Sequence, residues 1–192
     1  MKLLSPVAGP ISLPWSALRI SVLLAAGVAL MTLSAKVQIP FWPVPMTLHT
    51  LAVFAYAVFF GPRWATSIFA AYLAAGALGL PVFSGTPDRG IGLAYIAGPI
   101  GGYLLGFLIA SWVIGALAAG RGWLWQAGAM LTGLAIVYGF GLAWLAFFVP
   151  GDQLLTVGIA PFLVGDLVKI GLVLAGSTTC VKLMSRFGGH RP

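Results

Sequence analysis

Long apolar segments run through almost the whole sequence and are interrupted only at intervals by charges, prolines and glycines. A membrane-spanning helix needs about 20 mainly apolar residues, and several of these segments reach that length. The interruptions contain residues that break helices, such as the prolines at 40, 43 and 45. Most of this chain is therefore expected to lie in a membrane rather than in water.

The side chains that cover the surface of a soluble protein are almost absent. Charged residues make up 7% of the chain, with three Asp and no Glu, whereas a soluble domain has about 25% charged residues. A transmembrane β-barrel is also excluded, because its strands alternate apolar and polar residues. The sequence therefore predicts an all-α integral membrane protein.

The interruptions divide the chain into six predicted transmembrane helices. They cover residues 17–35, 46–60, 64–80, 95–119, 123–149 and 161–184. All six belong to one predicted domain, residues 1–192, with a basic tail at about 185–192. The second helix is short for a crossing, so the Pro-rich run before it is expected to dip into the membrane, where irregular backbone must be covered by protein or line a cavity.

Basic residues gather on one side of this topology. With six crossings, the side that holds both termini receives Lys2, Arg19, Arg63, Arg121, Lys182, Arg186 and Arg191. The other side is neutral and receives Lys36, Asp88, Arg89 and Asp152. By the positive-inside rule the first side is cytoplasmic, so both termini are predicted to lie inside a bacterial cytoplasmic membrane. The bases are too scattered along the chain for a nucleic-acid-binding patch.

Asp166 and Lys169 lie inside the last predicted helix, near its outer end. Ionisable side chains inside a membrane are costly and by default mark a functional site. Their i, i+3 spacing places them on one face of the helix, within mutual reach. The alternative is an ion pair that only fixes the position of the helix, but such a pair is a weak source of stability. The pattern therefore favours ligand binding.

Three further residues on the outer side are candidate ligand contacts. Arg89, in the 85–90 loop, suits bidentate binding of a carboxylate, although it is equally compatible with a solvated loop. Tyr103 follows the glycine-rich run 98–102 and is either a binding residue or an interfacial anchor, while the glycines themselves favour helix packing. His49 lies near the outer rim as a hydrogen-bonding residue. With one other His and one Cys in the chain, the ligands for a metal site are missing.

Small residues recur every four positions in the first predicted helix. The stripe consists of Ala17, Ser21, Ala25 and Ala29. Small side chains let a second helix approach closely. The stripe therefore either docks another membrane protein or packs within this chain.

The sequence lacks the motifs of the common hydrolases. It has no phosphate-binding Gly-x-x-x-x-Gly-Lys-Ser/Thr loop, no Gly-x-Ser-x-Gly, and no Glu for a His-Glu-x-x-His site. No cofactor and no ATPase activity are therefore predicted. Two alternatives stay open, namely a small intramembrane enzyme that uses Asp166 and Lys169 as acid and base, and a structural membrane subunit.

Five segments, in this order, resemble the BioY family, the biotin-specific substrate-capture (S) components of energy-coupling-factor (ECF) transporters. They are residues 44–51, 61–63, 76–85, 98–107 and 161–169, the last with the pattern Pro-Phe-x-x-Gly-Asp-x-x-Lys. The sequence departs from the family at His49, where Gln is usual, and at 86–89, which interrupt a loop that is often a simple glycine repeat. An S component for a different vitamin stays an alternative.

The resemblance implies a six-helix fold with an outward-facing biotin pocket near the membrane surface. Asp166 and Lys169 are then expected to hold the polar groups of biotin, and Phe41, Trp42 and Phe83 are candidates to cover its apolar body. The resemblance further implies a membrane coupling protein that docks on the small-residue stripe of the first helix, together with two cytoplasmic ATPase subunits or domains.

Overall fold

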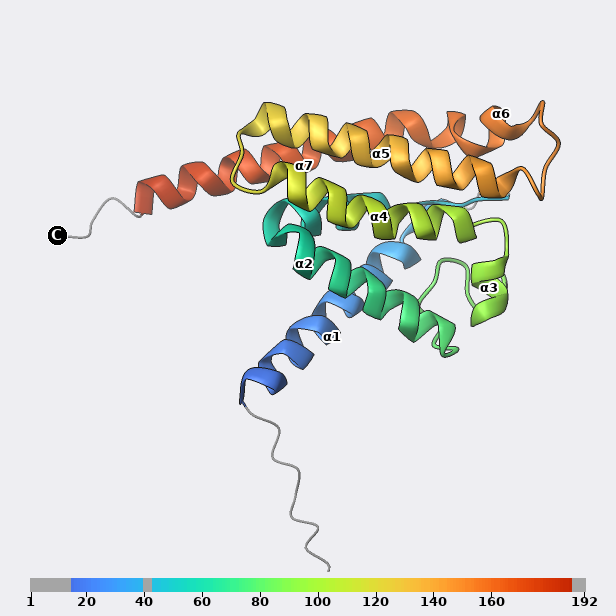
Figure 1. Ribbon diagram of the computed structural model, residues 1–192, viewed down its shortest axis with the longest axis horizontal. Coiled ribbons are helices and arrows are strands. Elements are labelled where there is room, and N and C mark those ends of the chain that lie inside the picture. The colour runs from blue at the N-terminus through green and yellow to red at the C-terminus, as the bar shows by residue number, and fades with distance from the viewer. Residues whose placement is uncertain (1–14, 40–42, 188–192) are drawn as a thin grey trace, which may run out of the picture.

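The computed structural model describes residues 15–39 and 43–187, which form seven helices and one short hairpin (Figure 1). In chain order the elements are α1 (Trp15–Lys36), β1 (Gln38–Ile39), β2 (Met46–Thr47), α2 (His49–Ala77), α3 (Leu93–Ala97), α4 (Gly101–Ala118), α5 (Trp123–Leu145), α6 (Leu154–Gly158) and α7 (Ala160–Phe187). In the described part, five helical segments are long and apolar enough to cross a membrane: α1, α2, α4, α5 and the segment Leu154–Cys180. The prediction of an all-helical fold is confirmed, with five segments that could cross a membrane.

Helix α2 folds back on itself at Gly61. This residue has a φ of 75° and a ψ of −179°, a left-handed conformation that glycine adopts readily, and Pro62 follows it. The ring centroids of His49 and Tyr72 lie 5.0 Å apart, although a straight helix would separate the two positions by about 35 Å. Residues 49–60 and 62–77 therefore form two antiparallel arms, which correspond to the helices predicted over 46–60 and 64–80.

The predicted helix over 95–119 is wrong at its start. Gly98 has an extended backbone with a ψ of −174°, and the following Pro99 cannot donate a backbone hydrogen bond. These two residues split the segment into α3 and α4. At the other end of the chain, Pro161 lies in the first turn of α7, as predicted, and this helix extends beyond 184 to Phe187.

Glycines allow α4 to pack closely against α5. A Cβ atom added at Gly102 would overlap the Cβ of Trp144 and the carbonyl oxygen of Phe140. A Cβ at Gly106 would lie 2.8 Å from the Cα of Val137. Glycines at such positions let two backbones meet, and α4 is enclosed between α2 and α5. This confirms the expectation that glycine at 102 serves helix packing.

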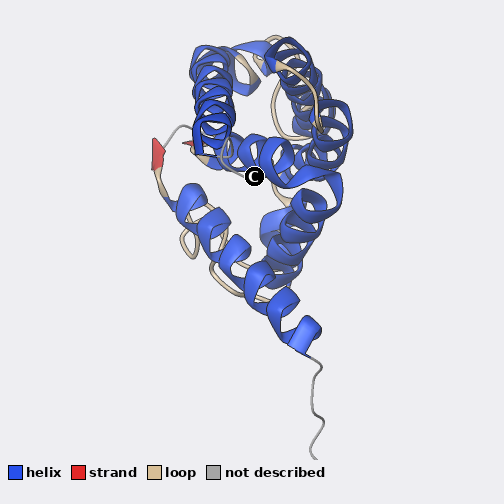
Figure 2. Ribbon diagram, turned by 90° about the vertical axis from the view of Figure 1, so that its left-hand side faces the viewer, coloured by secondary structure: helices blue, strands red, loops and turns tan. Residues whose placement is uncertain are grey.

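Helix α1 packs chiefly against α2 and stands apart from the group formed by α4, α5 and α7 (Figures 1 and 2). On the side that faces the bundle, the hydroxyl of Tyr56 donates a hydrogen bond of 3.1 Å to the carbonyl of Gly27. A Cβ at Gly27 would lie 2.9 Å from the side chain of Ile68. Gly27 is therefore a position at which α1 and α2 approach each other closely.

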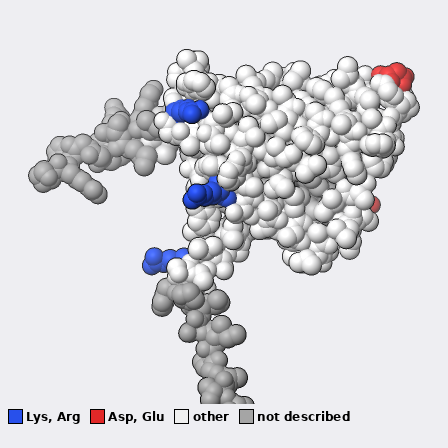
Figure 3. All heavy atoms as spheres, viewed as in Figure 1, with Lys and Arg blue, Asp and Glu red and all other residues white. Residues whose placement is uncertain are grey.

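Charged side chains gather at the two ends of the molecule (Figure 3). Lys and Arg lie along the left edge of this view, over the start of α1, the turn of α2 and the start of α5, where the sequence has Arg19, Arg63 and Arg121. Asp side chains lie at the right end, which carries the loops with Asp88 and Asp152. One end of the described bundle is therefore basic, and the acids lie elsewhere.

Candidate ligand-binding site

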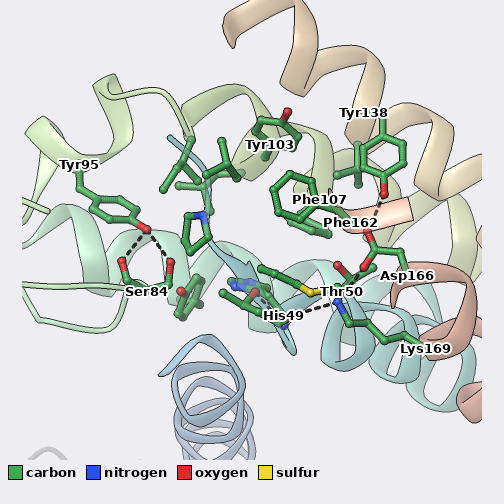
Figure 4. A pocket seen from close by; sticks show the side chains of 18 residues that line it. His49, Thr50, Ser84, Tyr95, Tyr103, Phe107, Tyr138, Phe162, Asp166 and Lys169 are labelled. Atoms are coloured by element: carbon green, nitrogen blue, oxygen red, sulfur yellow. Dashed lines mark hydrogen bonds and ion pairs between the residues drawn. The ribbon is translucent and has the colours of Figure 1, made fainter. Parts of the chain in front are cut away.

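A cavity lies between α2, α4, α5 and α7, and the chain before α2 forms one of its walls (Figure 4). The volume of this cavity is about 60 Å³. Residues 44–47, which are not helical, line it directly. Irregular backbone is tolerated at membrane depth where it faces a cavity. The sequence predicts such a position for the Pro-rich run, of which residues 44 and 45 line the cavity. The remaining lining residues are His49, Thr50, Tyr72, Ser84, Tyr95, Ile100, Tyr103, Leu104, Phe107, Val137, Tyr138, Phe162, Asp166 and Lys169.

Asp166 and Lys169 form a buried ion pair on α7. The Nζ of Lys169 lies 2.7 Å from the Oδ1 of Asp166, and the two side chains are 9% and 6% exposed, respectively. Nζ also donates a hydrogen bond of 2.7 Å to the carbonyl of Thr47. The hydroxyl of Tyr138 donates to the Oδ2 of Asp166 at 2.8 Å. These contacts offset part of the cost of burying two charges and join α7 to β2 and α5.

The ion pair keeps hydrogen-bonding capacity for a ligand. An ammonium group has three N–H donors, and the described residues accept only two of those of Lys169. Each carboxylate oxygen has two lone pairs, and each oxygen of Asp166 accepts one hydrogen bond from the described residues. The pair can therefore bind a group that presents an N–H donor and a carbonyl acceptor side by side.

His49 lines the same cavity from the first turn of α2. Its ring stacks on Phe107 with centroids 5.3 Å apart and an interplanar angle of 12°, and its ring centroid lies 5.4 Å from that of Phe69. The residue is 5% exposed, and its buried Nε2 has no hydrogen-bond partner among the described residues. The unpartnered Nε2 leaves His49 able to form a further hydrogen bond. No group of three metal-ligating side chains forms in the described chain.

The other two predicted ligand contacts have different positions. Tyr103 lines the cavity, but its hydroxyl donates a hydrogen bond of 2.9 Å to the carbonyl of Gly158. Its ring is therefore the part that faces a ligand. Arg89 lies in an adjoining cavity, where one guanidinium nitrogen donates to the carbonyl of Pro43 at 3.1 Å. Tyr95 lines both cavities and separates Arg89 from the ion pair.

Ser84 and Tyr95 form a second polar group, on the side of the cavity away from the ion pair (Figure 4). The Tyr95 hydroxyl donates to the Ser84 carbonyl at 2.9 Å, and the Ser84 Oγ lies 3.0 Å from the same hydroxyl. Burial raises the pKa of Tyr95, so this phenol stays protonated at neutral pH. Phe83 stacks behind Tyr95 at 4.6 Å and does not line the cavity, while Phe41 and Trp42 lie outside the described residues.

Sequence reasoning missed Tyr138 and the backbone contact of Thr47. A signal for Tyr138 exists, because its hydroxyl lies within the apolar segment 123–149 and a buried tyrosine usually has a hydrogen-bond partner. Thr47 contributes a main-chain carbonyl, and no residue type in the sequence marks such a contact.

The predicted docking stripe lies on the side of α1 that is not covered by the chain. Ser21, Ala25 and Ala29 are exposed, and Ala17 is partly exposed. Ala25 and Ala29 border a shallow groove whose far side is formed by Ala71 and Ala75 of α2. The stripe therefore does not serve to pack α1 against the described bundle.

Comparisons with known proteins give one consistent result. A sequence model of the BioY family matches residues 9–186. The biotin transporter BioY of Thermotoga maritima is 38% identical over 152 residues, which cover 77% of this chain and 88% of that protein. The probable biotin transporter BioY of Pyrococcus horikoshii is 37% identical over 168 residues, covering 88% and 95%. The crystal structure of the S-component for biotin from an ECF-type ABC transporter superposes with a TM-score of 0.71 at 26% identity, covering 87% of this chain and 93% of that one.

Proposed function

Since the chain belongs to the BioY family, we propose that it binds biotin and is the substrate-specific component for biotin uptake across the cytoplasmic membrane. The observation that carries this proposal is the buried Asp166–Lys169 pair on the wall of a largely apolar cavity. The relatives are transporters rather than enzymes, and the similar solved structure is an S-component for biotin.

The chemistry of biotin matches the two polar groups of the cavity. Its ureido ring carries two N–H donors and one carbonyl, and its carboxylate ends an apolar tail. In our proposal Asp166 accepts one ureido N–H and Lys169 donates to the ureido oxygen. The rings of Tyr103 and Phe107 cover the apolar part, and His49 contacts the ligand from α2. The carboxylate points toward Tyr95, with Arg89 beyond it.

We propose that the chain crosses the membrane six times, with each arm of α2 as a separate crossing. The basic end of the bundle then faces the cytoplasm by the positive-inside rule, together with both termini. The cavity lies at the opposite end, with β2 and α3, and opens to the outside. Labelling a single cysteine introduced at Asp152 with a membrane-impermeant reagent tests this orientation, because reaction in intact cells is expected only for an external position.

Biotin binding by the purified chain in lipid nanodiscs tests the proposed function. We expect saturable one-site binding in a calorimetric titration, with the ligand recovered unchanged, and no displacement by other vitamins. Displacement by another vitamin would instead indicate an S component of different specificity. A chemically altered ligand would support the intramembrane enzyme, and binding of none of the vitamins would support a structural subunit.

We also propose that a membrane coupling protein, which joins the chain to cytoplasmic ATPase subunits, docks on the exposed stripe of α1. Replacing Ala29 or Ala25 by Phe is expected to abolish co-purification with that protein, because a bulky side chain prevents the close approach of a second helix. Biotin affinity is expected to stay unchanged, since the stripe is remote from the cavity lining.

Ala26→Phe is the matched control for this experiment. Ala26 is also exposed on α1 but borders a different groove, which Leu23, Phe60 and Trp64 line as well. The control variant is expected to keep its partner. Loss of biotin binding together with partner binding in Ala29→Phe would mean that the stripe is needed for the fold instead.

A further inference from the structure

We infer, on the basis of the proposed biotin binding, that the imidazole of His49 accepts a hydrogen bond from the second ureido N–H of biotin. This is the N–H that the Asp166–Lys169 pair does not reach. His49 is then a specificity-determining residue, which selects a cyclic urea over rings that lack one of the two N–H groups.

The ureido ring of biotin presents one more N–H donor than the Asp166–Lys169 pair is positioned to accept. A cyclic urea has one N–H on each side of its carbonyl. The interacting atoms of Asp166 and Lys169 lie 2.7 Å apart, so the pair can bind one N–H together with the neighbouring carbonyl. The second N–H points away from the pair, on the other side of the carbonyl. A buried donor without an acceptor costs free energy, so the cavity needs one more acceptor there.

On the protein side, His49 has the required unused capacity. Its imidazole lines the cavity, is 5% exposed, and has a buried Nε2 without a partner among the described residues. The stacked ring of Phe107 at 5.3 Å and the edge of Tyr72 at 5.0 Å fix the plane of the imidazole. The residue therefore offers a hydrogen-bonding group held in one orientation and not used by the fold.

His49 also lies at the correct end of the cavity. Its backbone N–H donates to the Oγ1 of Thr47 at 3.1 Å, and the carbonyl of Thr47 accepts from Lys169. The backbone of His49 is thus connected to the ion pair through one intervening residue, which places the start of α2 next to the pair. Figure 4 shows His49 on the α2 side of the cavity, between the Asp166–Lys169 pair and Ser84.

The imidazole has the right chemistry for an acceptor. Burial without a carboxylate partner favours the neutral ring, and a neutral imidazole has one nitrogen that donates and one that accepts. Thr50 is the rival acceptor, because its buried side chain lines the same wall one residue further along α2.

The test combines variants with ligand analogues in nanodiscs. His49→Phe keeps an aromatic ring but removes both nitrogens, His49→Gln keeps an acceptor, and Thr50→Val removes the rival acceptor. The ligands are biotin and the two cyclic carbamates in which one or the other ureido N–H is replaced by oxygen. We expect His49→Phe to weaken biotin binding about 10- to 100-fold, whereas His49→Gln retains most of the affinity.

The analogues identify the hydrogen bond itself. The carbamate that lacks the N–H assigned to His49 is expected to bind the wild type as weakly as biotin binds His49→Phe. Its affinity is expected to be the same for His49→Phe as for the wild type. Equal biotin affinity in wild type and His49→Phe, or loss in Thr50→Val alone, would overturn the inference. If His49→Phe does not fold, the affinities of the wild type for biotin and the two carbamates still test the inference. Equal affinity for all three ligands contradicts it. Failure of the proposed function looks different, since the wild type then does not bind biotin at all.

Discussion

Replacing Asp166 by Asn is expected to lower the affinity for biotin by about 100-fold or more. The carboxylate accepts hydrogen bonds from Lys169 at 2.7 Å and from Tyr138 at 2.8 Å, and in our proposal it also accepts one from the ligand. An amide has a single acceptor oxygen and turns its NH₂ group toward one of these donors. Truncating one partner of a buried, hydrogen-bonded charge pair costs about 2–5 kcal/mol or more. Titration of biotin into the purified variant measures the loss.

A double variant separates binding from folding. Asp166→Asn with Lys169→Met removes both charges, so no unpaired ammonium stays buried, and replacing a whole buried pair is often neutral for stability. We expect the thermal stability of the double variant to return toward that of the wild type while biotin binding stays lost. The exposed Asp152 provides the control, since Asp152→Asn should change neither quantity. If Asp166→Asn bound biotin with the affinity of the wild type, the ion pair would not be part of the ligand-binding site.

Replacing Gly102 by Leu is expected to have the largest effect on the fold. Even a Cβ at this position overlaps the Cβ of Trp144 and the carbonyl oxygen of Phe140, and a backbone carbonyl cannot rotate away as a flexible side chain can. Helices α4 and α5 must then separate, which opens the cavity wall that contains Tyr103 and Tyr138. Overpacking of this kind costs about 3 kcal/mol or more. The measurement is the midpoint of thermal unfolding in detergent, together with the yield of monodisperse protein.

Gly139→Leu is the matched control for this prediction. Gly139 also belongs to α5, but it is exposed and a Cβ added there meets nothing within 4 Å. A leucine at this position would contact lipid, so the unfolding midpoint is expected to stay close to that of the wild type. Equal destabilisation by both substitutions would mean that helix propensity rather than the contact between α4 and α5 decides the result.

The fold was predictable as far as it depends on local signals. Apolar length and charge gave the membrane helices, and Gly61 with Pro62 marked the point at which α2 reverses. The break at Gly98 and Pro99 was missed because the segment stays apolar on both sides of it, so that hydropathy gives no boundary. Whether an apolar segment is one helix or two depends on the backbone angles of a few residues, which composition does not record.

The site was predictable where a residue is costly in its surroundings. Asp166 and Lys169 could be predicted as site residues because charged side chains inside an apolar segment are costly and usually functional. Their partners Tyr138 and Thr47 lie 28 and 122 positions away in the sequence, and only the packing of α7 against α5 and β2 brings these groups together. The position of Arg89 in the adjoining cavity likewise depends on how the loop after α2 folds, which no local pattern specifies.

The hydrogen bonds from Thr47 through Lys169 and Asp166 to Tyr138 have a consequence for the speed of binding. They fix the polar groups of the cavity before any ligand arrives, so a ligand does not have to order these side chains as it binds. Association should then proceed at the rate at which molecules find the mouth of the cavity. Weakening one of these bonds, as in Tyr138→Phe, is expected to slow association, because the polar groups then have to be ordered as the ligand binds. The association rate of biotin therefore reports on the integrity of this chain of contacts.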